Sequence, residues 1–323
     1  MTKNLLFLTI IFTLIGCQKD NKISKNTDST VQTSSSNLKS EESYITTQDS
    51  IKIKYKVSGK GKPCLYIHGG PGQGYFSFEL MKGNGLEAEL QMIYYDQRGS
   101  GSSGKAKDYH IDAMMNDIET LRKHLGLDKF FVLSHSFGGV LATEYARRFP
   151  QHVEGLILAN ATLHFFNEET TLEQIKFADQ LLGQKSSTVP IEKDSLLPMF
   201  LNLRQALSKN KMGYRFLTDD VNSIIKMEEI DSLHPRIDDF GTAMITEPKK
   251  YPEYYKDYAL LTKDIQVPTL VISGSRDYAV GTKHYKTFKF PQQKTALLEG
   301  GHLLYYENNR DFVKTVFDFI RKN

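Results

Sequence analysis

Residues 130–150 have the sequence FFVLSHSFGGVLATEYARRFP, the most informative segment of the chain. It predicts a short apolar strand over residues 130–133, a tight turn at Ser136, and a helix that begins near Phe137. A serine between a strand and a helix, followed by two glycines, is the pattern of a nucleophile elbow, G-x-S-x-G. Ser134 replaces the first glycine, which is a mild departure because serine is also small. A serine that caps an ordinary helix is the alternative for this segment alone.

Short apolar runs alternate with helical patterns on both sides of this segment. Residues 44–47 and 51–57 favour an antiparallel hairpin, because polar residues separate two β-rich runs. Buried strands are predicted at 64–67 and 92–95, further strands at 153–159, 267–274 and 294–298, and helices at 111–125 and 310–321. This alternation is typical of an α/β fold with a mostly parallel, doubly wound sheet.

The alternation stops between residues 162 and 258, where the chain is rich in Lys, Glu, Met and Leu. This part is mostly helical in pattern and contains no clear strand. We therefore expect a core formed by residues 44–161 and 259–323, with residues 162–258 inserted as a helical cap. Such a cap would cover the carboxyl edge of the sheet, where these folds bind ligands.

Residues 1–17 have the layout of a secretory signal, with an apolar run too short to span a bilayer comfortably. The run ends in Leu-Ile-Gly-Cys, which resembles a lipobox with Cys17 as the lipidated residue. Gln18 follows it, rather than the aspartate that retains many lipoproteins at an inner membrane. Residues 18–43 are almost free of apolar side chains and predict a flexible tether. We expect a lipid anchor in a bacterial cell envelope, most simply the outer membrane; an uncleaved anchor is the alternative.

The composition limits the possible partners. The chain has 323 residues, of which 40% are hydrophobic and 24% charged. Its net charge is only +3 and charges of both signs are interspersed, so the sequence gives no basis for nucleic-acid binding. Cys17 and Cys64 are the two cysteines, so no disulfide framework is expected if Cys17 is modified. Cys64 lies in an apolar run, which is typical of a buried cysteine. Metal and phosphate-loop motifs are missing from the sequence, so we expect no cofactor and no metal.

Three residues that follow predicted strands have the types and order of a catalytic triad. Ser136 follows the elbow strand, Asp277 lies in GSRDY after the next-to-last strand, and His302 lies in EGGH after the last. A serine hydroxyl needs a base to take its proton, and the base needs an acid to fix its tautomer. Doubly wound hydrolases present these groups in the order serine, acid, histidine. Glu299 is the alternative acid, disfavoured because it precedes the histidine by only three residues.

Acyl transfer also needs hydrogen-bond donors for the developing oxyanion. The backbone N–H of Phe137, directly after the nucleophile, is one expected donor. The other is expected from His68-Gly-Gly-Pro-Gly72, where glycines allow close approach of the backbone, and Gly70 is the favoured residue.

These segments resemble the α/β-hydrolases and, within them, the proline iminopeptidase family. The resemblance rests on His68-Gly-Gly-Pro-Gly72, on DQRGSGSS at residues 96–103, and on the contexts of Ser136, Asp277 and His302. It implies removal of an N-terminal residue, often proline, from small peptides, amides or esters. It also implies that cap glutamates bind the substrate amine; the candidates are Glu168, Glu169, Glu173, Glu228, Glu229, Glu247 and Glu253. The chain departs from the family at the elbow, where Ser134 and Phe137 replace glycine and tryptophan.

Three functions remain open at this stage. The first is an aminopeptidase of the proline iminopeptidase type. The second is an esterase or lactonase that acts on a small apolar acyl substrate. The third is a catalytically silent binding lipoprotein on the same fold.

Overall fold

The computed structural model describes residues 38–185, 192–234 and 236–323. The predicted signal peptide, its Cys17 and residues 18–37 of the predicted tether lie outside these ranges. Within them, none of the helices is both long and apolar enough to cross a membrane.

Eight of the described strands form one sheet, in the order β1-β2-β4-β3-β6-β7-β9-β10. Their bounds are β1 Glu41–Thr46, β2 Lys52–Gly59, β3 Lys62–Ile67, β4 Leu90–Tyr95, β6 Phe130–His135, β7 Val153–Ala159, β9 Thr269–Gly274 and β10 Gln293–Leu298. Within this sheet β2 pairs antiparallel with both β1 and β4, and the other neighbouring strands pair in parallel. The prediction of a mostly parallel α/β sheet with an antiparallel hairpin at its start is therefore confirmed.

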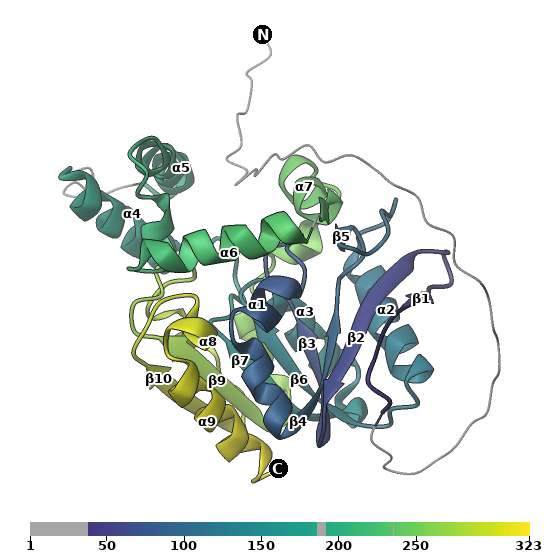
Figure 1. The fold of residues 1–323 in the computed structure, drawn as a ribbon. Coiled ribbons are helices and arrows are strands. Elements are labelled where there is room, and N and C mark those ends of the chain that lie inside the picture. Colours follow the sequence, from purple (N-terminus) through teal and green to yellow (C-terminus); the bar gives the residue numbers. More distant parts are fainter. Residues whose placement is uncertain (1–37, 186–191, 235) are drawn as a thin grey trace.

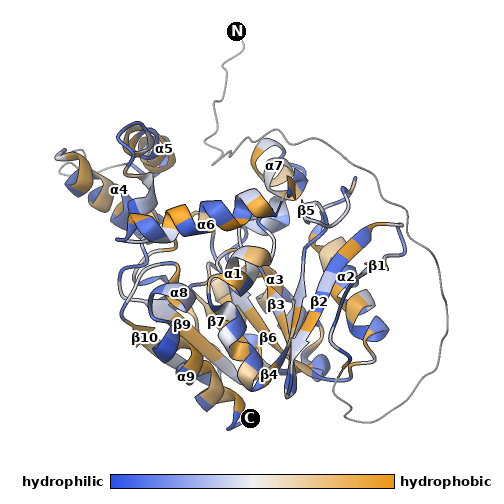
Figure 2. Cartoon of the chain, in the orientation of Figure 1, coloured by the Kyte–Doolittle hydropathy of each residue, from blue (hydrophilic) through white to orange (hydrophobic). Residues whose placement is uncertain are grey.

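Helices cover both faces of the sheet (Figure 1). One face carries α2 (Ile111–His124) and α3 (Gly138–Arg148), and the other carries α1 (Phe76–Leu80), α8 (Leu304–Glu307) and α9 (Asn309–Ile320). Strands β4, β6 and β9 are buried along their whole length, as expected where both faces are covered. Hydrophobic residues accordingly concentrate in the sheet (Figure 2).

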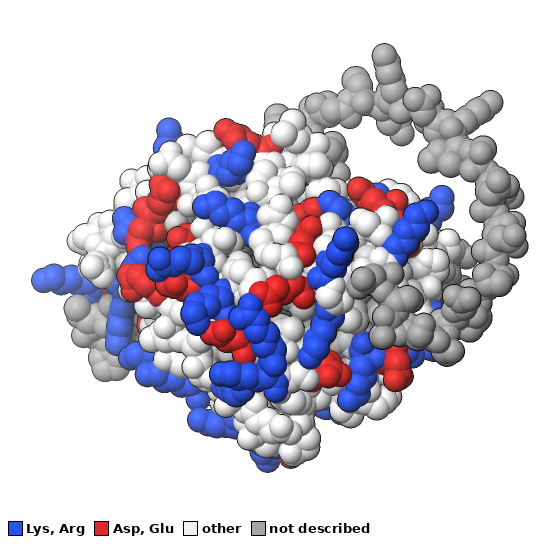
Figure 3. Space-filling view, turned by 60° about the horizontal axis from the view of Figure 1, so that its bottom comes forward, with Lys and Arg blue, Asp and Glu red and all other residues white. Residues whose placement is uncertain are grey.

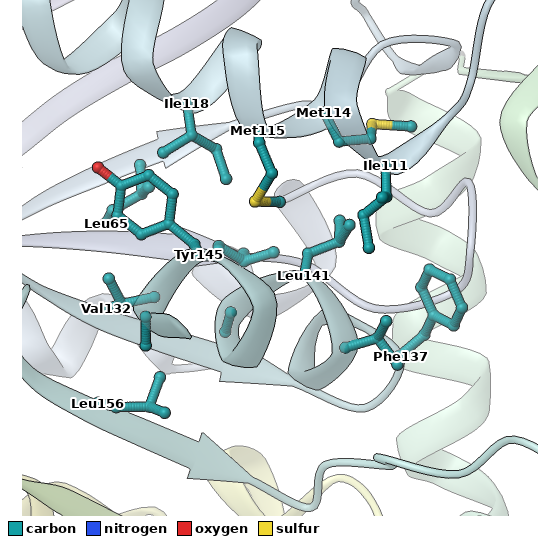
Figure 4. Packing of buried hydrophobic residues seen from close by; sticks show 14 of the residues in the cluster. Leu65, Ile111, Met114, Met115, Ile118, Val132, Phe137, Leu141, Tyr145 and Leu156 are labelled. Carbon is teal, nitrogen blue, oxygen red and sulfur yellow. The ribbon is translucent and has the colours of Figure 1, made fainter. Parts of the chain in front are cut away.

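Alternate side chains of each strand enter different cores. Leu65 and Ile67 of β3 face α2 and α3, whereas Cys64 and Tyr66 face the opposite helices. Figure 4 shows the first of these cores, where side chains from α2 and α3 converge over the central strands. Cys64 is fully buried, as its apolar surroundings predict, and burial raises the pKa of its thiol. This packing fixes the strand ends at which the candidate site residues lie.

The cap lies above one end of the sheet (Figure 1). It contains α4 (Glu168–Leu182), α5 (Lys193–Lys209), α6 (Val221–Leu233), α7 (Asp239–Thr246) and the short strand β8 (Ile237–Asp238). Short 3-10 helices complete the fold: η1 Gly83–Ala88, η2 Pro150–His152, η4 Gly213–Phe216, η5 Pro252–Tyr255, η6 Tyr258–Asp264 and η7 His284–Thr287. The chain enters and leaves the cap at one place, because the Tyr258 N–H donates to the Leu163 carbonyl over 2.7 Å.

Two local expectations need correction. The predicted tether of residues 18–43 extends too far, because β1 already begins at Glu41 and Leu38 exchanges hydrogen bonds with the Gln91 side chain. Polar residues can form this strand because it is the exposed edge of the sheet. The cap also contains a strand, β8, which pairs antiparallel with β5 (Ser100–Gly101). Two residues are too few to show a strand pattern in the sequence.

Charges of both signs are intermixed on the face of the molecule seen from below the sheet (Figure 3). This distribution agrees with the low net charge of +3.

Candidate active site

Ser136 occupies a strained turn between β6 and α3. Its φ is +55°, a left-handed conformation that a non-glycine residue rarely adopts. The neighbouring backbone is packed so closely that side chains are excluded: a Cβ on Gly138 would lie 2.3 Å from the Ile67 carbonyl oxygen, and one on Gly69 would lie 2.8 Å from Ser136 Cβ. The turn therefore has the strain and crowding of a nucleophile elbow.

Serine at position 134 fits where the pattern has glycine. Ser134 is fully buried near the end of β6, and its hydroxyl donates to the Ile157 carbonyl of β7 over 3.5 Å. Its one polar atom thus has a partner, and the departure from the pattern does not disturb the sheet.

Asp277 and His302 come together although 25 residues separate them along the chain. The His302 Nδ1 lies 3.1 Å and 3.0 Å from the two carboxylate oxygens of Asp277. Asp277 is fully buried, and its Oδ1 also accepts the backbone N–H groups of Ala279 and Val280. A carboxylate held in this way keeps the Nδ1 proton in place and leaves the histidine Nε2 free to act as a base.

Ser136 and His302 lie in neighbouring loops. The ring of His135, the residue before Ser136, is 4.5 Å from the His302 ring between centroids. The structure shows no hydrogen bond from the Ser136 hydroxyl to His302 within the described residues. Such bonds are often long before substrate binds and shorten only in the complex.

His135 is a residue that the sequence analysis overlooked. Its Nε2–H donates to the His302 carbonyl over 2.9 Å, since a carbonyl can only accept. Burial and the neighbouring His302 lower its pKa to about 3, so the ring is neutral. His135 thus links the nucleophile turn to the backbone of His302. The signal in the sequence was its place directly before the predicted nucleophile.

The predicted oxyanion donors are Gly70 and Phe137. Gly70 has a φ of +116°, which favours glycine, and Phe137 is the N-terminal cap residue of α3. Within the described part of the chain neither backbone N–H has a hydrogen-bond acceptor. Phe137 is buried, whereas Gly70 is exposed.

The residues after β3 and β4 hold each other in place. The Gln97 N–H donates to His68 Nε2 over 3.0 Å, and the Gln97 side chain donates to the His68 carbonyl over 2.8 Å. The Asp96 carboxylate accepts the backbone N–H groups of Tyr75 and Ser102. Burial lowers the pKa of His68 to about 4, so this histidine is neutral and acts as a structural link. DQRG therefore fixes the glycine loop that carries Gly70.

Asn160 supports the other half of the site in a similar way, and the sequence analysis overlooked it. It follows β7, adopts a φ of +46° and is buried. Its side chain donates to the Gly301 carbonyl over 2.6 Å and accepts the Gly274 N–H over 3.1 Å. One side chain thus joins the loops that carry Asp277 and His302.

The profile of the family described as alpha/beta hydrolase fold matches residues 62–309 of this chain. The chain belongs to the α/β-hydrolase family.

Known proteins similar to this α/β-hydrolase include proline iminopeptidases and esterases. It is 25% identical to the proline iminopeptidase PfmaB of Pestalotiopsis fici over 289 residues, 84% of this chain and 96% of the relative. A proline iminopeptidase-related protein of Thermus thermophilus superposes with a TM-score of 0.72 at 22% identity, covering 88% of this chain and 98% of that one. An esterase of Exiguobacterium antarcticum superposes with a TM-score of 0.64 at 21% identity, covering 87% and 100%. Both superpositions show the shared fold.

In this α/β-hydrolase the cap holds the loop that follows Asp277. The Glu173 carboxylate of α4 accepts the N–H of Thr282 over 2.8 Å and also its hydroxyl. Gln174 donates to the carbonyls of Tyr278 and Ala279, at 2.9 Å each. Helix α4 therefore lies directly against the acid loop.

A second part of the cap reaches the histidine loop. The His302 N–H donates to the Leu217 carbonyl over 2.7 Å. Arg276, next to Asp277, pairs with Asp219 of the cap and with Glu299 of the histidine loop. Glu299, the alternative acid, is thus an exposed partner of Arg276, while Asp277 contacts the histidine.

The seven cap glutamates have other contacts or face solvent. Glu173 holds Thr282, and Glu253 accepts from His110 and the Ile111 N–H on α2. Glu168, Glu229 and Glu247 pair with lysines, Glu169 is exposed and Glu228 is half-buried. The described contacts bring none of the seven to the glycine loop.

An aspartate of the cap, rather than one of these glutamates, lies against the glycine loop. Asp238 of β8 lies so close to the glycine loop that a Cβ on Gly72 would be 1.6 Å from its Oδ1. A Cβ on Gly241 would be 2.1 Å from the same oxygen. Partial burial raises the pKa of Asp238 to about 6, although the residue keeps an exposed surface. The sequence could not reveal this acid, because its place depends on the pairing of β8 with β5.

Proposed function

We propose that this α/β-hydrolase is a serine hydrolase with Ser136 as nucleophile, His302 as general base and acid, and Asp277 as the residue that orients the histidine. The observation that carries the proposal is the pair of contacts from His302 Nδ1 to the buried Asp277 carboxylate, in a loop next to the strained Ser136 turn. A binding protein on this fold would need neither the strain nor the buried pair.

The proposed reaction is acyl transfer to the serine and then to water. The Ser136 hydroxyl attacks the substrate carbonyl carbon while His302 Nε2 takes its proton. The N–H groups of Gly70 and Phe137 stabilise the oxyanion. As the intermediate collapses, His302 gives the proton to the leaving group, and the acyl group stays on Ser136 as an ester. Water then repeats the sequence and releases the acid.

We propose a small peptide or related amide with a free N-terminal amine as the substrate. Asp238 supports this choice, because it places an accessible carboxylate against the loop that carries Gly70. A carboxylate with a pKa of about 6 is mostly ionised at pH 7 and can pair with an ammonium group. Similarity to the proline iminopeptidase of Pestalotiopsis fici over most of both chains agrees with this proposal.

An esterase acting on a small apolar acyl group is the second candidate. Aromatic rings surround Phe137, with the rings of Tyr254, Phe165 and Phe240 at centroid distances of 5.7, 5.9 and 5.9 Å. Such surroundings suit an apolar acyl chain as well as a proline ring.

Hydrolysis of three substrates by the whole chain tests the proposal: a proline anilide, its N-acetyl derivative and a short acyl ester. We expect cleavage of the free-amine anilide, little cleavage of the blocked one, and loss of all turnover in Ser136→Ala. Residual turnover of at least 10⁻² of the wild-type rate in a folded Ser136→Ala variant contradicts the nucleophile assignment, since removing a triad serine costs about 10⁶ in kcat. Cleavage of the ester alone favours the esterase.

The lipid anchor at Cys17 stays a prediction from the sequence.

A further inference from the structure

His135 connects the Ser136 turn directly to His302. It is the last residue of β6, immediately before Ser136, and its side chain is buried. Its Nε2–H donates to the His302 carbonyl over 2.9 Å, across 167 residues of the chain. Among the described residues no other hydrogen bond joins residues 135–137 to His302. The position of the histidine relative to the serine therefore depends on this side chain.

The backbone around His302 is held at each of its polar groups. The His302 N–H donates to the Leu217 carbonyl of the cap, and the Gly301 N–H donates to the Glu307 carboxylate. The Gly301 carbonyl accepts from the Asn160 side chain. These three partners fix the histidine loop to the cap, to α8 and to the end of β7. The His302 carbonyl is the group in this set whose partner comes from the Ser136 turn.

The His135 ring also packs against the His302 imidazole. The two ring centroids are 4.5 Å apart, and the ring planes are inclined by 47°. The His135 ring meets the buried Tyr305 ring as well, at 5.1 Å between centroids and nearly at right angles. Packed against both rings, the His135 side chain has little freedom to turn. Asp277 thus fixes the Nδ1 side of His302, while His135 contacts the same imidazole from the Ser136 turn.

A hydrogen-bond donor at this position has to be uncharged. In the proposed reaction His302 becomes a cation when it takes the proton of Ser136. A second positive charge so close to the ring would disfavour that cation. Burial and the neighbouring His302 lower the pKa of His135 to about 3, so its ring is neutral at pH 7. His135 therefore supplies an N–H to the His302 backbone without opposing the charge on the imidazole.

We propose that His135 is a positioning residue, which holds His302 where its Nε2 can take the serine proton and pass it to the leaving group. The inference rests on the proposed function, with Ser136 as nucleophile and His302 as base and acid. Proton transfer requires the two groups to lie within hydrogen-bond reach, so a small displacement of His302 slows this step.

The test compares two esters that share an acyl group, 4-nitrophenyl butyrate and ethyl butyrate, as substrates of the whole chain. Ethanol must receive a proton as it leaves, whereas 4-nitrophenolate leaves without one. In His135→Phe, which keeps a ring but removes the donor, we expect kcat/KM to fall about 100-fold for the ethyl ester and about tenfold for the nitrophenyl ester. The loss for the ethyl ester should lie in kcat, with KM little changed. A smaller fraction of active protein would instead lower both values by the same factor.

Two amide variants and a matched control locate the effect. His135→Gln places a neutral N–H about as far from the backbone as the histidine Nε2, so it should recover much of the ethyl ester activity. His135→Asn places its N–H closer to the backbone and should behave like His135→Phe. His284→Phe changes another buried histidine, which accepts the Leu163 N–H and lies outside the catalytic loops. It should keep the wild-type ratio of the two esters, whatever loss of stability urea denaturation shows.

Three outcomes overturn the inference alone: wild-type rates in a folded His135→Phe variant, an equal loss for both esters, or a His135→Gln variant no more active than His135→Asn. The 4-nitrophenyl and ethyl esters of proline form a second pair, for an enzyme that requires a free amine on the acyl group. If the wild type cleaves none of these esters, the proposed function fails and the inference fails with it. Cleavage of either pair leaves the proposed function standing, and the His135 variants then decide the inference.

Discussion

The two halves of the candidate active site are held by different parts of the molecule. The glycine loop with Gly70 is fixed by core residues, through His68 and Gln97 and through the Asp96 carboxylate. The acid and histidine loops are joined by Asn160 of the core but also depend on the cap, through Glu173, Gln174 and Leu217. The cap is thus more than a cover for substrate. It forms part of the framework that orients Asp277 and His302.

This difference predicts that damage to the core half lowers stability, whereas damage to the cap half lowers activity in a protein that remains folded.

The largest expected effect is a loss of stability from a substitution on the core side, at Arg98. Its guanidinium is almost fully buried and donates to Asp117 at 2.7 Å through two nitrogens, with Asp49 as a second partner. Arg98→Met leaves the Asp117 carboxylate buried without a counter-charge, so we expect a loss of about 3–5 kcal/mol in the free energy of unfolding. Urea denaturation measures it. Arg321→Met, which breaks an exposed pair with Glu89, should leave the free energy of unfolding almost unchanged. Equal losses in both variants would contradict the structural role of DQRG.

The second effect concerns Asp238, where the cap touches the core-held glycine loop. Asp238→Asn removes the proposed partner of the substrate amine, so kcat/KM for the free-amine anilide should fall about 10- to 100-fold, as for a charged hydrogen bond. The ester should be unaffected. Because the pKa of Asp238 is raised to about 6, its carboxylate gains a proton below that pH and loses its attraction for an ammonium group. The ratio of anilide to ester kcat/KM should therefore fall as the pH drops through 6.

Asp239→Asn is the matched control for that prediction, since Asp239 is the next residue and pairs with Lys105. A wild-type ratio that stays constant from pH 5 to 8 would rule out Asp238 as the amine partner. So would a loss of kcat/KM for the free-amine anilide in Asp239→Asn as large as that in Asp238→Asn.

The smallest effect is expected on the cap side, at Glu173. Glu173→Gln replaces one of the two oxygens that accept from Thr282, which loosens the acid loop behind Asp277. We expect kcat to fall about tenfold, equivalent to about 1.4 kcal/mol in the activation barrier, with KM little changed and a loss of about 1 kcal/mol in stability. Glu169→Gln, at an exposed position of the same helix, should leave kcat unchanged. A wild-type kcat in Glu173→Gln would show that the core alone positions the acid loop.

Much of the fold was predictable because its signals are local. A strand buried on both faces needs a continuous apolar run, as in β4, β6 and β9, and a parallel sheet needs helices between its strands. The position of Ser136 was equally local, because a strained strand-to-helix turn needs small residues such as Gly138 beside it. The start of β1 was missed because an exposed edge strand tolerates polar residues.

The sequence by itself determined the α/β class, the order of Ser136, Asp277 and His302, and the glycine loop, since each depends on residue types close together in the chain. The tertiary structure decided which polar residues support or complete them. Asn160 joins two loops more than 100 residues away, Asp238 reaches the glycine loop through β8, and His135 donates to the backbone of His302, 167 residues later in the chain. These roles depend on distances between segments remote in sequence, which only the packed chain sets.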